Sequence, residues 1–93
     1  MSKIKKLSLI NGKFEEEEAR EILMNLFSTK IQFHELRNFS SQIRFSQDDE
    51  IAQNRIPELK KSKEKLRLIL LEAKAKNKRL IITSDINITL SDD

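Results

Sequence analysis

His34 is the only histidine in the chain, and it stands beside Glu35. A catalytic histidine needs a hydrogen-bonded group that orients it, and a nucleophile or a substrate within reach. Residues 30–36, KIQFHEL, alternate as a strand does, so His34 and Glu35 are expected to point to opposite faces. One imidazole is also too few for a histidine-based metal site unless carboxylates supplement it. We therefore interpret His34 as a structural or surface residue.

Carboxylates gather in the run Glu15–Glu18, which is a conceivable cation site. Successive helical residues diverge by about 100°, so a run of neighbours does not converge on one ion. The run instead suits the first turn of a helix, where negative charge opposes the positive end of the dipole. The chain has no cysteine, which excludes disulfides, thiol nucleophiles and thiolate metal sites. We expect no catalytic residue, metal or cofactor, and hence no enzyme.

The net charge of +3 conceals a basic block. Residues 51–79 carry ten basic and three acidic side chains, a balance of +7, whereas residues 80–93 carry only acidic ones. Such a block suits an acidic protein partner, an acidic patch on a second copy, or nucleic-acid phosphates. The alternative function is therefore RNA or DNA backbone binding by a basic helix, residues 60–79, and a loop, residues 37–46. The candidate residues are Arg37, Phe39, Arg44, Lys60, Lys61, Lys65, Arg67 and Lys74.

Two considerations weigh against sequence-specific recognition of a nucleic acid. Lysine outnumbers arginine twelve to six, whereas base readout favours arginine. The competing interpretation of residues 37–46 is that Phe39 and its apolar neighbours pack the loop against a sheet edge. In that case the basic helix face is simply solvated, with pairs between glutamates and lysines one turn apart.

The strongest indication of function is a helical segment, residues 59–75, with apolar residues on two sides. One side has helical spacing over Leu59, Leu66, Leu70 and Ala73, and the other over Leu68, Leu71 and Ala75. One face can cover a sheet, which leaves the second without a partner in so small a fold. Two buried leucines contribute about 3–6 kcal/mol of apolar transfer, enough to bias association. We therefore predict an interaction module that forms a homodimer through Leu68, Leu71 and Ala75; scattered exposed leucines on a monomer are the competing interpretation.

The elements expected in the first half are a strand, a helix, a second strand and a loop. Residues 3–10 alternate as a strand, and Asn11-Gly12 is expected to turn the chain into a helix over 15–28. That helix has one apolar stripe. Residues 30–36 alternate again and predict a second strand, and residues 37–46 have no period and predict a loop.

A long helix and a third strand are expected in the second half. Ser46 and Asp49 resemble a capping box, so a helix is expected over 47–77, kinked near Pro57 and stopped by Asn77. A new helix beginning at Pro57 is the alternative. Residues 79–90 alternate cleanly and predict the best strand of the chain, with Ser84 interrupting its apolar face.

These elements predict a small two-layer α/β domain, or α+β, spanning residues 1–93 in the order β-α-β-α-β. Helices between strands favour parallel pairing, so we expect a three-stranded sheet with both helices on one face. The unpaired sheet edges then remain available to another copy. No signal peptide or membrane span is recognisable, and a cytoplasmic location is expected.

Overall fold

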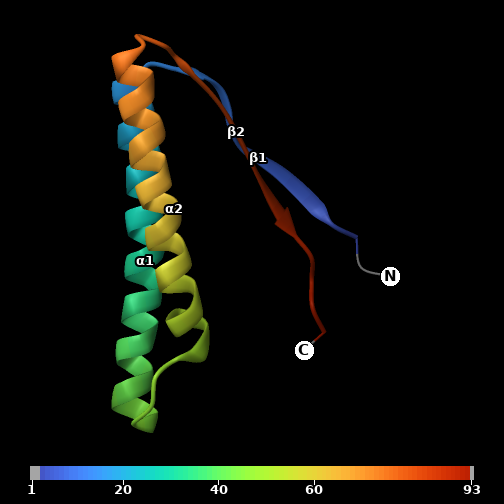
Figure 1. Cartoon of the computed structure of the whole chain (residues 1–93). Coiled ribbons are helices and arrows are strands. Elements are labelled where there is room, and N and C mark those ends of the chain that lie inside the picture. The colour runs from blue at the N-terminus through green and yellow to red at the C-terminus, as the bar shows by residue number, and fades with distance from the viewer. Residues whose placement is uncertain (1–2, 93) are drawn as a thin grey trace.

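The computed structural model describes residues 3–92 and is a helix hairpin joined to a two-stranded ribbon (Figure 1). The elements are β1 (Lys5–Phe14), α1 (Glu16–Phe45), α2 (Glu50–Ala75) and β2 (Leu80–Ile88). The prediction of a mixed α/β fold is confirmed, but the predicted three strands and β-α-β-α-β order are wrong. The strands are antiparallel and pair with each other, because the two helices between them form a hairpin that returns the chain to its starting end.

The predicted strand over residues 30–36 and the predicted loop over 37–46 are both part of α1. Ile31, His34 and Asn38 follow one another at helical spacing, and all three are wholly or partly buried on the side of α1 that faces α2. The alternation in KIQFHEL is too short to outweigh that longer period, since local propensity yields to burial against a neighbouring element. The helix predicted over 15–28 is accordingly much longer, with thirty residues.

The connection between the helices is short and capped at both ends. Ser46 ends α1 in the left-handed conformation, with φ of 55°. The helix predicted to begin at residue 47 begins at Glu50, because Asp49, not Ser46, is its cap. The Asp49 carboxylate accepts a hydrogen bond from the Ala52 amide at 2.9 Å, and the Asp49 amide donates to Asn38 Oδ1 at 2.8 Å.

Pro57 lies inside α2, which runs through it as one helix of 26 residues. A new helix therefore does not begin at the proline. Beyond Ala75, where α2 ends, Asn77 adopts the left-handed conformation with φ of 53° and turns the chain toward β2.

Strand β1 extends through the predicted turn at Asn11-Gly12. Gly12 lies opposite Ile82, and a Cβ added there would come within 3.3 Å of the Phe14 ring. The glycine therefore makes room for an aromatic side chain rather than a turn. A bulge between Ser8 and Ile10 interrupts the ladder farther from the helices.

The core lies where the ribbon leaves the helices. Ala19, Leu66 and Leu70 are buried together there, and side chains from both strands cover them, including Phe14, Leu80 and Ile82. Away from this end, the ribbon diverges from the helix hairpin (Figure 1). The helices and the ribbon therefore share only part of their length as a packed interface.

This shape leaves an unusually large surface. The accessible area is 7870 Å², whereas a compact chain of 10.9 kDa is expected to expose about 5600 Å². The radius of gyration is 16.7 Å, against about 12 Å for a compact domain of this length. The excess of roughly 2300 Å² is therefore a property of an extended arrangement, and much of it is apolar.

Candidate interaction surfaces

The outer side of α2 carries the apolar residues that the sequence singled out. Leu68 is 54% exposed and Leu71 is 45% exposed, and Ala75 is exposed beside them. Leu59, Leu66 and Leu70 on the opposite side of the same helix are buried. We call Leu68, Leu71 and Ala75 the α2 stripe. Nothing in the described chain covers it, so its apolar side chains are available for contact.

A second apolar stripe runs along α1 and was missed from the sequence. Its large side chains are all at least 37% exposed and lie on the side of α1 away from α2: Ile22, Leu26, Phe33, Leu36 and Ile43. With Thr29 and Ser40 they recur at alternating spacings of four and three residues, the period of a coiled-coil seam. This four-and-three spacing was the sequence signal for the stripe. It was overlooked because residues 30–46 were predicted to form a strand and a loop. We call these five residues the α1 stripe.

Basic side chains line one flank of the α1 stripe. Lys30, Arg37 and Arg44 are seven residues apart along the helix and therefore share a side. Lys30 Nζ lies 4.7 Å from the centre of the Phe33 ring, and Arg37 Cζ lies 5.7 Å from it. These are cation–π contacts at an exposed aromatic ring. The stripe thus combines an apolar seam with a positive border.

The residues proposed for nucleic-acid binding do not gather on one face. Arg37, Phe39 and Arg44 lie on α1, with Phe39 on another side of the helix from the two arginines. The remaining candidates are distributed along the exposed surface of α2: Lys60, Lys61, Lys65, Arg67 and Lys74. The structure therefore divides the basic candidates between the two helices.

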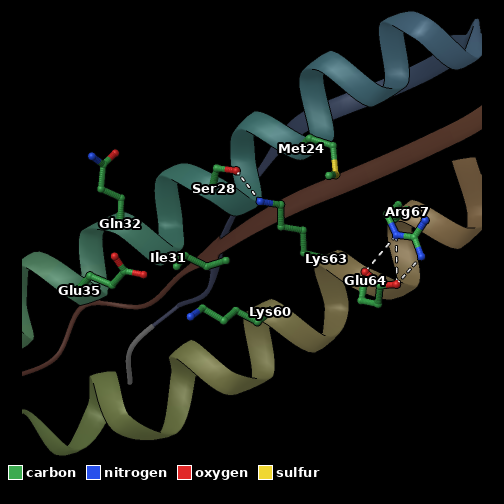
Figure 2. A pocket seen from close by; sticks show the side chains of 9 residues that line it. All are labelled: Met24, Ser28, Ile31, Gln32, Glu35, Lys60, Lys63, Glu64 and Arg67. Carbon is green, nitrogen blue, oxygen red and sulfur yellow. Dashed lines mark hydrogen bonds and ion pairs between the residues drawn. The ribbon is translucent and has the colours of Figure 1, made fainter.

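A groove of about 680 Å³ lies between the two helices and contains two of these candidates, Lys60 and Arg67 (Figure 2). Arg67 donates to both oxygens of Glu64, at 2.6–3.1 Å, and this pairing raises the pKa of Arg67 and lowers that of Glu64. Lys63 Nζ donates to Ser28 Oγ at 3.0 Å, which ties α2 to α1 across the groove (Figure 2). Seven of the nine residues that line the groove are polar or charged, and two of its cations already have partners.

His34 is a core residue at the helix interface. It is only 5% exposed, and neither ring nitrogen has a hydrogen-bond partner among residues 3–92. Its ring meets the Phe33 ring edge to face, with centroids 5.4 Å apart. Burial, together with the nearby Lys30 and Arg55, lowers the pKa of His34 below 6.5. The imidazole is therefore neutral at pH 7 and packs as an aromatic side chain against Phe33.

Other kinds of site find no support in the described part of the chain. Residues 3–92 hold no cluster of three or more histidine, cysteine or acidic side chains placed to share a metal ion. None of the described helices combines the length and the apolar character needed to cross a membrane. Comparison of the chain with family models, with curated proteins and with solved structures gives no match. The exposed surfaces are therefore the features of the described residues that bear on function.

Proposed function

We propose that this protein is a small interaction module that associates with a second copy of itself through exposed apolar surface. The observation that carries the proposal is the exposure of Leu68 and Leu71 on a chain whose surface exceeds that of a compact fold by roughly 2300 Å². A stable complex of standard size buries about 800 Å² on each partner. The excess is ample for such an interface.

The α2 stripe is the proposed contact of the module. Two buried leucines supply about 3–6 kcal/mol of apolar transfer, which falls short of the cost of association by itself. The aliphatic stems of the lysines and arginines around the stripe can add apolar area while their charges stay in water. The remainder has to come from further surface buried at the same time.

Sedimentation equilibrium at micromolar concentration tests the proposal. The wild-type chain should sediment as a dimer, and the double variant Leu68→Glu, Leu71→Glu should shift toward monomer because it places two carboxylates in an apolar contact. The matched control is Asn54→Glu, Ser62→Glu, which adds the same charge at exposed positions of α2 outside the stripe. A wild-type chain that is monomeric throughout would overturn self-association. A dimer unaffected by the stripe variant would remove the α2 stripe from the interface.

Binding to a nucleic-acid backbone is a second candidate, supported by the line of Lys30, Arg37 and Arg44 beside the exposed Phe33 ring. Cations and an aromatic ring on one helix side can contact phosphates and stack on bases. The expected result is a mobility shift with single-stranded RNA at low salt that weakens steeply as salt rises and is lost in Arg37→Glu, Arg44→Glu. The absence of any shift at low salt would exclude this function.

A further inference from the structure

The outer edge of β2 is an unprotected strand edge. A sheet of two strands is marginally stable by itself, and natural proteins protect free edges with bulges, lysines or prolines. Strand β1 has such protection, with three lysines and a bulge between Ser8 and Ile10. Strand β2 is nine residues long and has neither proline nor lysine, and its one charge, Asp85, already pairs with Lys6 at 3.4 Å. Of the two edges, that of β2 is the one suited to accept another strand.

The sequence of β2 is nearly symmetric about its central residue, Ser84. Its apolar face consists of Leu80, Ile82, Ile86 and Ile88, two on each side of that serine. If β2 pairs antiparallel with its own copy about Ser84, Leu80 lies opposite the partner's Ile88 and Ile82 opposite the partner's Ile86. Asp85 then faces the partner's Thr83 rather than a like charge. The register that places apolar residues opposite apolar residues therefore also keeps the two Asp85 carboxylates from facing each other.

One half of the ribbon's apolar face is only partly covered in the single chain. Leu80 and Ile82, next to the helices, pack on the core. Ile86 and Ile88, at the far end, are 40% and 42% exposed, and Leu7, opposite Ile86, is 55% exposed. Antiparallel pairing about Ser84 places this exposed end beside the helix-covered end of the second copy. The same pairing thus occupies the free edge and shelters the exposed end.

We infer that two copies join along β2 to make a four-stranded antiparallel sheet in the order β1-β2-β2-β1, with Ser84 at the two-fold axis. This axis is perpendicular to the sheet, so the helix hairpins of both copies lie on the same face of it. The inference rests on the proposed self-association and specifies its geometry: the occupant of the edge is a second copy of this chain. Pairing at the edge buries backbone and apolar area along β2.

Disulfide trapping tests this register, because the chain has no native cysteine. Directly opposed residues of an antiparallel pair have Cα atoms about 4.5–5.5 Å apart, within the range of a disulfide. The variant Ser84→Cys should therefore give a covalent dimer in oxidised glutathione, measured on a non-reducing gel. Thiols held at millimolar effective concentration should link ~100-fold faster than thiols that collide at micromolar concentration.

The matched controls are Thr83→Cys and Asp85→Cys. In the inferred register Thr83 of one copy lies opposite Asp85 of the other. The two Thr83 residues are then diagonal neighbours about 7–8 Å apart, which is beyond the reach of a disulfide. Each variant alone should link slowly, whereas in an equal mixture the mixed dimers, about half of all dimers, should link as fast as Ser84→Cys. Equal rates in all samples would overturn the register, as would a dimer by sedimentation in which Ser84→Cys does not link. A wild-type monomer by sedimentation would overturn self-association itself together with the register.

Discussion

Replacement of Pro57 by alanine should stabilise this protein. Pro57 is exposed and lies well inside α2, which begins at Glu50 and continues to Ala75. There the ring cannot donate to the carbonyl of Gln53, one turn earlier, and crowds that same carbonyl. Alanine restores the missing hydrogen bond and removes the crowding, and it leaves no cavity because the ring is not buried.

The expected gain can be worked out from these terms. Proline in a helix interior costs about 3 kcal/mol relative to alanine. Removing proline also frees the unfolded chain, which lowers the gain by about 0.4–1 kcal/mol. A net stabilisation of about 2 kcal/mol remains, which for a chain of this size is roughly 8–16 °C in Tm.

Circular dichroism with heating, at matched protein concentration, measures this gain. Matching matters because the proposed self-association would make Tm depend on protein concentration. The control is Ser62→Ala, another exposed position of α2, where only helix propensity changes and the gain should stay below about 0.5 kcal/mol. An unchanged or lowered Tm in Pro57→Ala would refute the reasoning. It would mean that a bend at the proline is needed to seat the buried Ala52 against α1.

Two other substitutions probe the hairpin end and the buried histidine. Asp49→Ala should lower the free energy of unfolding by about 1 kcal/mol in urea denaturation, since the Ala52 amide loses its cap, whereas Asp49→Asn should retain most of it. The pKa of His34 is lowered in the folded state, so the unfolded chain binds the proton more tightly and stability should decline as pH falls below about 6.5. His34→Leu should remove that part of the pH dependence of Tm between pH 7 and pH 5; an undiminished dependence would assign it to carboxylates instead.

The sequence was informative where one period extends over a whole element. The long helix and the last strand were predictable because Leu59, Leu66 and Leu70 keep helical phase and because apolar residues alternate from Leu80 to Ile88 with only Ser84 interrupting them. Residues 30–46 were misassigned because seven residues of chance alternation, KIQFHEL, were interpreted without their flanks. Extended to Ile22 and Ile43, the same segment has a clear four-and-three spacing. The wrong prediction of parallel strand pairing followed from this error. Two helices in succession return the chain to its starting end, so the strands before and after them pair antiparallel.

The candidate surfaces were predictable to the same extent. The α2 stripe could be found because it lies on a correctly assigned helix, and the α1 stripe was lost with the second half of its helix. The outer face of β2 was visible as an alternating pattern, but its free edge was not. Whether an edge is free depends on how many strands the sheet contains, and no local pattern contains that number.

The ribbon and the helix hairpin pack against each other at one end only. The buried cluster of Ala19, Leu66 and Leu70 is small, and it anchors only the near ends of the strands. Beyond it the far halves of β1 and β2 have each other's hydrogen bonds but only partial apolar cover, a condition in which two-stranded ribbons are marginal. A second copy laid along β2 would supply both missing contributions at once, a third strand for the ladder and a covering layer for Ile86 and Ile88. If two copies pair along β2 as inferred, completing the sheet and forming the complex are the same physical step.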